Sequence, residues 1–186
     1  MKILYSLPIL IFLISCSVNP VTGKQNFVTI SENQEIAMGK KYHAQVLQQY
    51  PIYPDEDLQL YVQKIGDSLS SKSHRPNLYY RFTVLDSPDI NAFALPGGYI
   101  YINRGLMAYL SSEEELAAVL GHEIGHVTAR HSVRQQSQSQ LLGILTATVD
   151  MKTGRSAGNL MNLASGALLA GYGREMELEA DDLGAQ

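Results

Sequence analysis

The segment GHEIGH at residues 121–126 places two histidines and a glutamate within an almost uninterrupted apolar stretch. Residues 116–133 predict a helix that is apolar nearly all round and therefore buried. Ser111 or Ser112 begins this helix, because each has a glutamate three residues later, which is the capping-box spacing. Burying imidazoles and a carboxylate is unfavourable without polar partners. The chain must therefore fold so that other groups meet this helix.

A shared metal ion is one such partner. His122 and His126 are four residues apart, so on a helix they lie on one face, one turn apart. Two imidazoles in that position can each reach a zinc ion at roughly 2.0–2.1 Å. Glu123 lies about 100° around the helix, where it can act on water at the metal as a catalytic base. We predict one Zn²⁺ per chain; the alternative is a core helix whose histidines are satisfied by hydrogen bonds.

A hydrolytic zinc site needs a third protein ligand. His131 follows His122 by nine residues, which is roughly 180° around a continuing helix, and is therefore excluded. His43 and His74 lie in unrelated segments and are expected at the surface. The remaining candidates are acidic residues near the C-terminus.

The segment REMELEAD at residues 174–181 supplies acidic candidates. Glu177 and Asp181 share one face of a predicted helix, so Glu177 can ligate the metal while Asp181 accepts the N–H of a ligating histidine. Glu175 and Glu179 lie about 200° from Glu177 and are expected to face solvent. A solvated helix face is the alternative interpretation of this alternating charge.

The rest of the chain predicts a small sheet between helices, and so an α+β fold that is mainly helical. Its hydrophobic periodicity changes from helical to alternating after residue 70. The expected elements are helices at 32–50 and 56–70, a strand at 79–86, an extended stretch at 91–102 that turns at 96–98, the buried HExxH helix, and a final helix within 174–186.

Composition excludes several function classes. The chain has 186 residues and a net charge of −4, so it offers no basic field for nucleic acid. Cys16 is its only cysteine, which excludes an intramolecular disulfide and a cysteine-based zinc site. We expect one globular domain and no nucleic-acid partner.

The N-terminus has the order of a secretory signal. Residues 1–15 contain one lysine, an apolar run and a small residue before Cys16. The ending LISC resembles a bacterial lipobox, which implies cleavage at Cys16 and its lipidation. Residues 16–31 then form a tether, and Ser17 favours the outer membrane by analogy with other lipoproteins. The alternative is a buried N-terminal helix.

The two site segments together resemble a known family. HEIGH followed by YGREMELEADDLG resembles the gluzincin zinc metallopeptidases related to HtpX and the CAAX prenyl protease. NPVTGKQ and INAFALPGGYIYINRGLM agree best with its periplasmic lipoprotein branch, which includes the β-barrel assembly-enhancing protease. The resemblance implies a zincin-like domain at residues 32–186 with Glu177 as third ligand. Because members of this branch usually continue further, it also implies a domain truncated at its C-terminus.

The resemblance also implies substrate contacts and a function. An active-site edge strand is implied by NAFALPGG, with an ordinary hairpin as the alternative; the candidate substrate contacts are Asn91, Ala92, Phe93, Ala94 and Leu95. The expected function is a zinc metalloendopeptidase that is lipid-anchored in the bacterial periplasm and degrades misfolded or misassembled envelope proteins. The alternatives are a lipid-anchored chaperone or assembly factor with a non-catalytic zinc site, and a metal-free binding module. Residues 135–171 are expected to form core helices or a lid.

Overall fold

The structure is a computed structural model that describes residues 16–18, 21, 23, 25–140 and 172–186. The predicted signal peptide and most of the predicted lid segment lie outside these residues. The named elements run in the order β1 (Cys16–Val18), β2 (Gln25–Phe27), α1 (Glu32–Gln49), α2 (Glu56–Ser70), β3 (Arg81–Leu85), β4 (Ala92–Leu95), β5 (Tyr99–Asn103), α3 (Arg104–Met107), α4 (Glu113–Thr128) and α7 (Arg174–Gly184).

The helices begin where side chains can cap them. Ser31 and Gln34 form a complete capping box at the start of α1. Asp55 accepts a hydrogen bond from the backbone of Leu58 at the start of α2. At α4 the cap is Ser112, whose side chain accepts from the Glu115 N–H. The helices predicted at 32–50 and 56–70 are thus confirmed, and of the two serines it is the second that caps α4.

A three-stranded sheet with the order β3-β5-β4 forms the centre of the fold. β3 is parallel to β5, whereas β4 and β5 form an antiparallel hairpin. The hairpin turns at Gly97 and Gly98, whose φ angles of 77° and 93° are accessible mainly to glycine. The predicted strand and hairpin are therefore confirmed.

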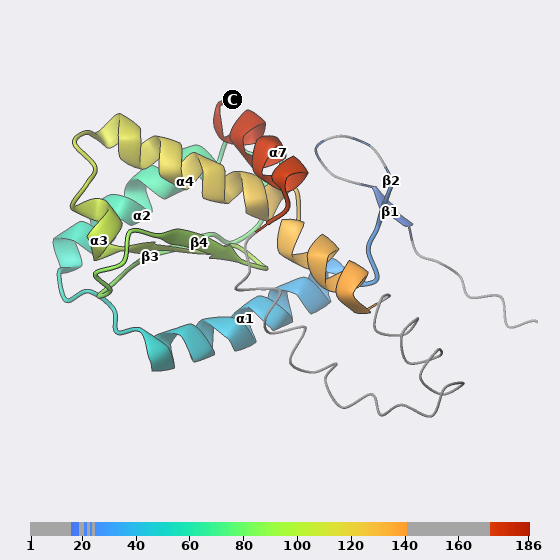
Figure 1. Cartoon of the computed structure of the whole chain (residues 1–186), viewed down its shortest axis with the longest axis horizontal. Coiled ribbons are helices and arrows are strands. Elements are labelled where there is room, and N and C mark those ends of the chain that lie inside the picture. Colours follow the sequence, from blue (N-terminus) through green and yellow to red (C-terminus); the bar gives the residue numbers. More distant parts are fainter. Residues whose placement is uncertain (1–15, 19–20, 22, 24, 141–171) are drawn as a thin grey trace, which may run out of the picture.

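Helices cover both faces of this sheet (Figure 1). On one face, α2 and α4 pack against side chains such as Phe82, Ala94 and Ile100. On the other face, residues of α1 pack against Leu95 and Tyr101. This layered arrangement confirms the predicted α+β class and places the HExxH helix directly against β4.

The course of the chain after α4 differs from the sequence prediction. The buried helix does not run through to residue 133 but ends at Thr128. Arg130 adopts a left-handed conformation with a φ of 58°, and residues 131–140 are again helical. This strained conformation is held by the Arg130 guanidinium, which donates to the Glu35 carboxylate at 2.8 Å. A periodicity argument could not detect a break that a residue of α1 stabilises.

The N-terminal part of the described chain is extended. β1 pairs with β2 in an antiparallel hairpin. Among the described residues, no helix has both the length and the apolar character needed to cross a bilayer.

Candidate metal centre

Helix α7 lies directly against α4 because small residues line their contact (Figure 1). A Cβ atom added at Gly121 would lie 2.8 Å from the Gly184 carbonyl oxygen, and one at Gly125 would lie 2.7 Å from that of Ala180. Such contacts are closer than a side chain tolerates, so glycine is required for this approach. The four-residue spacing of these small residues on both helices is a signal that the sequence analysis missed.

The close approach brings three predicted ligands together. The Nε2 atoms of His122 and His126 are 2.9 Å apart. The Glu177 carboxylate lies 3.6 Å from the first of these nitrogens and 3.8 Å from the second. The ligand atoms of the three residues all lie within 4.8 Å of one another. Two helices that are far apart in the sequence thus converge on one point.

This donor set fits a zinc ion. Bonds of about 2.0–2.2 Å in a tetrahedral site place neighbouring ligand atoms about 3.4 Å apart. The three separations of 2.9, 3.6 and 3.8 Å lie around that value. Among the described residues, the cluster consists of two imidazoles and one carboxylate, which is the three-ligand set of a catalytic zinc site with its fourth position open. The residues present therefore match a catalytic rather than a structural zinc site.

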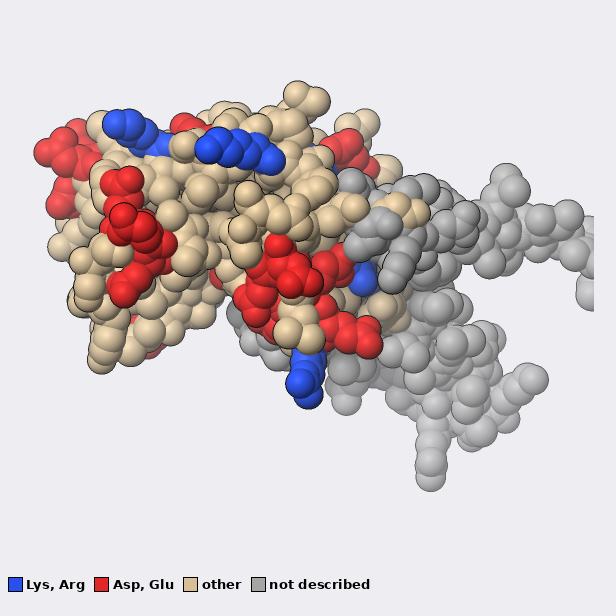
Figure 2. Space-filling view, turned by 90° about the horizontal axis from the view of Figure 1, so that it is seen from above, with Lys and Arg blue, Asp and Glu red and all other residues tan. Residues whose placement is uncertain are grey.

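A second carboxylate of α7 contacts the first of the two predicted ligand histidines. Asp181 lies 2.8 Å from Nδ1 of His122, on the opposite side of the ring from Glu177. That arrangement is the one predicted for Asp181, and it directs the other ring nitrogen towards the site. Figure 2 shows acidic side chains gathered over this part of the surface, and the exposed ones on α7 include Glu175, Asp181 and Asp182.

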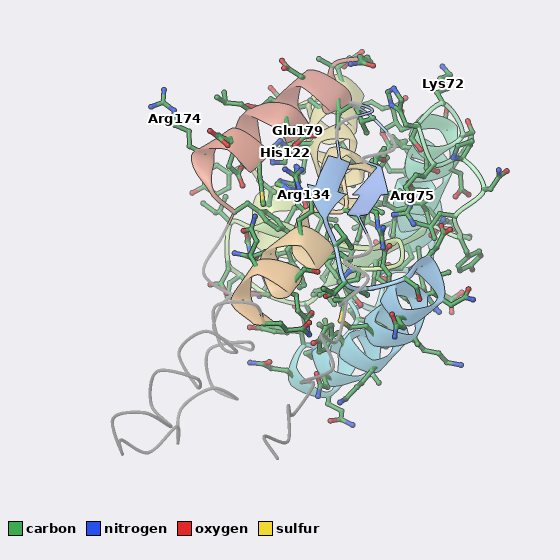
Figure 3. All side chains as sticks on the ribbon, turned by 90° about the vertical axis from the view of Figure 1, so that its right-hand side faces the viewer. Lys72, Arg75, His122, Arg134, Arg174 and Glu179 are labelled. Carbon is green, nitrogen blue, oxygen red and sulfur yellow. The ribbon has the colours of Figure 1, made fainter. Side chains whose placement is uncertain are left out.

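Glu179 is not solvent-facing, contrary to the sequence prediction. Its carboxylate lies 3.1 Å from Nε2 of His131 and accepts a hydrogen bond from Arg134 at 2.7 Å. In Figure 3, Glu179 and Arg134 are labelled in the region between α7 and the helical segment 131–140. The prediction was wrong because the helical segment 131–140 covers a face of α7 that an isolated helix would leave exposed. Glu175 on the same helix is exposed, as predicted.

The remaining histidines behave differently from one another. His131 is fully buried and lies 2.8 Å from His126, but it is not part of the ligand cluster. His74 is exposed, as predicted. His43 is half-buried rather than on the surface, since it stacks on Tyr99 and hydrogen-bonds the Tyr101 hydroxyl.

Burial controls the protonation of the site. Burial and, to a smaller extent, the negative charge of Glu177 together raise the pKa of Glu123 to about 8. Burial also lowers the pKa of His126 to about 3, with additional contributions from His131 and His122. His126 is therefore a neutral imidazole near pH 7, which is the form that binds a metal.

Tyr172 covers one side of His126. The two rings stack with centroids 4.1 Å apart, and the tyrosine hydroxyl lies 2.6 Å from the Ser132 hydroxyl. Burial is the main cause that raises the pKa of Tyr172 to about 12. No motif in the sequence marks Tyr172 as part of the site, although it lies shortly before the acidic helix.

Next to α4, the strand β4 forms an edge of the sheet. The Asn103 N–H donates to the Asn91 carbonyl at 2.9 Å, which marks a hydrogen-bonded pair of the hairpin. Such pairs alternate along an antiparallel ladder, so Phe93 bonds to β5 whereas the backbone groups of Ala92 and Ala94 point outward. Of the five predicted substrate contacts, Asn91, Phe93 and Leu95 therefore face β5 with their backbone groups, whereas those of Ala92 and Ala94 point outward.

A small sheet carrying a buried HExxH helix and a facing acidic helix defines a zincin-like domain. Residues 56–186 match peptidase family M48. The chain therefore belongs to this family of metalloproteases, and membership implies a metal cofactor.

Relatives support the same assignment. The chain is 36% identical over 127 residues to a β-barrel assembly-enhancing protease of Yersinia pestis, an alignment that covers 68% of this chain and 26% of the relative. The Escherichia coli K12 protein of the same name is 31% identical over 179 residues, covering 90% and 36%. The mitochondrial metalloendopeptidase OMA1 of Schizosaccharomyces pombe is 30% identical over 174 residues, covering 89% and 50%. This confirms the resemblance inferred from the motifs, and the chain spans half or less of each relative's length.

Proposed function

We propose that this chain is a zinc-dependent metalloendopeptidase whose zinc ion is held by His122, His126 and Glu177. The observation that carries the proposal is the convergence of these three side chains from α4 and α7. A bound zinc ion supplies Lewis acidity, which acidifies water and polarises the carbonyl group of a peptide bond.

Glu123 is the proposed catalytic base. It is the residue directly after the ligand His122, and it is buried within α4. The positive charge of a bound zinc ion would oppose the rise in the pKa of Glu123. The Glu123 carboxylate would then be available as a base near neutral pH. Glu123 takes a proton from the attacking water and passes that proton to the leaving amine nitrogen.

The outer edge of β4 is the proposed substrate-binding strand. An extended polypeptide can pair with the outward backbone groups of Ala92 and Ala94, as in recognition by strand addition. Pairing there holds the peptide beside α4, which packs against β4. The predicted contacts Asn91, Phe93 and Leu95 then contribute less through their backbone, because their ladder bonds face β5.

The proposed setting is the bacterial envelope. The lipobox-like ending at Cys16 supports a lipid anchor, probed by replacing Cys16 with serine and following the protein in membrane fractions. The names of the two bacterial relatives concern the assembly of β-barrel proteins. We therefore propose that the protein is held at the periplasmic side of the outer membrane. Its substrates are misfolded or misassembled envelope proteins.

A paired zinc and cleavage assay tests the function. Purified wild-type protein should contain one zinc ion per chain and cleave an unfolded outer-membrane protein. The Glu123→Gln variant should keep the zinc but lose about 1000-fold in kcat, because general acid–base catalysis contributes factors of this order. Wild-type protein without stoichiometric zinc would contradict the proposal. If Glu123→Gln still complements a deletion strain fully, the chaperone alternative is favoured instead.

A further inference from the structure

A chain of polar side chains leads away from the ligand cluster on the buried side of His126. Nδ1 of His126 lies 2.8 Å from Nδ1 of His131, and Nε2 of His131 lies 3.1 Å from Oε2 of Glu179. Arg134 donates to the same Glu179 oxygen at 2.7 Å. His131 is completely buried, so its hydrogen bonds to protein groups are decisive for its protonation.

These distances fix one direction for the hydrogen bonds. Two ring nitrogens 2.8 Å apart need one proton between them. Nε2 of His126 faces Glu177 and must keep its lone pair to bind a metal, so the proton is on its Nδ1. That N–H donates to Nδ1 of His131, which places the proton of His131 on Nε2. His131 then donates to Glu179, whose negative charge Arg134 balances.

The backbone break after α4 is what brings His131 into this position. In a continuing helix, His131 would lie about 140° around the axis from His126 and would point away from it. The left-handed conformation of Arg130 reverses this direction. Its guanidinium is held by Glu35 and donates to the carbonyl oxygen of Ile30 at 2.9 Å. Several contacts thus act together to hold the two imidazoles side by side.

We propose that His131 and Glu179 are positioning residues of the metal centre, which act on the metal through His126. They set its tautomer, direct its Nε2 towards the ion and raise its basicity. Asp181 does the same for His122 by direct contact. His126 is buried, so a neutral imidazole, His131, contacts its Nδ1 where His122 has a carboxylate. The charged carboxylate of this second path, Glu179, lies one residue further out, at a half-buried position. This inference rests on the proposed function only in taking His126 as a ligand.

Zinc affinity, measured by competition with a chromogenic chelator, tests the relay. His131→Leu should bind zinc 10- to 100-fold more weakly than wild type, which is the effect expected for lost orienting partners. Glu179→Gln should weaken binding by a smaller factor. The double variant should be within about twofold of His131→Leu, because both residues act along one path. Glu175→Gln is the matched control: it removes the same charge from an exposed position of α7 and should leave the affinity unchanged.

Two further measurements separate positioning from a merely structural role. In His131→Asn, the side-chain oxygen can still accept from His126, so this variant should recover most of the zinc affinity. In zinc-loaded wild-type protein, nitrogen-15 NMR should show His126 protonated at Nδ1 and His131 at Nε2. Circular dichroism establishes which variants fold, and Glu179→Gln provides the affinity comparison if His131→Leu does not.

The outcomes distinguish the two proposals. Tight zinc binding by folded His131→Leu or, where that variant does not fold, by Glu179→Gln overturns the relay and leaves the proposed function standing. Additive effects in the double variant, or a proton on Nδ1 of His131 in the zinc-loaded protein, also overturn the relay. Wild-type protein that binds no zinc overturns the proposed function itself, and the role of the relay in metal binding with it.

Discussion

The two outer edges of the three-stranded sheet are treated in opposite ways. On β3, the side-chain amide of Gln59 accepts from the Val84 N–H and donates to the Val84 carbonyl, each at 2.9 Å. Gln63 likewise accepts from the Phe82 N–H and donates to the Tyr80 carbonyl. Two glutamines of α2 therefore take the place of a neighbouring strand.

The outer edge of β4 has no such seal within the part of the chain that the structure describes. No hydrogen bond from a described residue reaches the outward backbone groups of Ala92 or Ala94. The side chains of Ala92 and Ala94 are short and pack towards α4 and α2. This is the edge at which the proposed substrate pairing takes place.

The difference shows how a sheet can restrict pairing with another chain to one of its two edges. Unpaired strand edges invite association with other chains, so proteins block the ones they do not use. Here the amides of Gln59 and Gln63 bond the outward backbone groups of β3. The proposed peptide binding uses the other edge, which lies beside the proposed metal site.

Removing the Gln59 hydrogen bonds to the edge of β3 should have the largest effect on stability. Gln59→Leu deletes three hydrogen bonds, one to the Tyr53 carbonyl and two to Val84. The Val84 N–H loses its partner, whereas both carbonyl oxygens still accept a backbone N–H, from Asp55 and Tyr53 respectively. At about 1 kcal/mol for each bond, the free energy of unfolding should fall by about 3 kcal/mol. Urea denaturation measures the change. Gln45→Leu, at an exposed position of α1, is the control and should change stability by less than about 0.5 kcal/mol. An equal loss in both variants would contradict the sealing role.

The pH dependence of stability sharpens the contrast, because the amides beside β3 do not titrate whereas groups in α4 do. In the metal-free protein, the pKa of Glu123 is raised from 4.5 to about 8. The unfolded state releases this proton at lower pH, so the side chain reduces stability as pH rises from 4.5 to 8. His126 acts in the opposite sense, since its lowered pKa reduces stability as pH falls from 6.5 towards 3.

Between pH 6.5 and 8, wild-type metal-free protein should therefore lose about 1.5 kcal/mol relative to Glu123→Gln. Chemical denaturation of both proteins across this range, in the presence of a chelator, measures the difference. Parallel stability curves would show that Glu123 does not titrate in this window.

Blocking the open edge should give the smallest of the three effects. Ala92→Pro removes an outward N–H, and proline is tolerated where an edge N–H faces away from the sheet. Loss of one hydrogen bond to the peptide should lower kcat/KM about tenfold, with zinc content unchanged. Ala92→Val keeps the N–H and serves as the control. Unchanged cleavage by folded Ala92→Pro would show that substrates do not pair at this position.

Local sequence signals predicted most of the elements. Ser112 was one of two predicted caps and does cap α4, while hydrophobic periodicity predicted α1 and α2, which the structure shows to be capped by Ser31 and Asp55. Pro96 to Gly98 mark the hairpin turn because the positive φ angles there require glycine. The end of α4 was predicted wrongly, since the left-handed Arg130 depends on a carboxylate about a hundred residues earlier in the chain.

For the site, the spacing of His122 and His126 predicted a shared face, and the structure shows their rings adjacent. Glu177 and Asp181 were placed on one face of the final helix, and both now lie against His122. Glu179 was assigned to solvent because helix geometry alone does not reveal which segment packs against the opposite face. Gly121 contacts Gly184, and this close approach could not be predicted without the relative positions of α4 and α7.

The sequence by itself determined where the longer helices and the central strands lie, which side chains share a face, and which chemistry those side chains can perform. These properties depend on interactions within a few residues, so they can be read along the chain. Only the tertiary structure decided that α7 packs on α4, that His131 turns back to His126, and that one sheet edge is sealed while the other is not. Those features depend on contacts between distant segments, whose free energies arise only once the layers have packed.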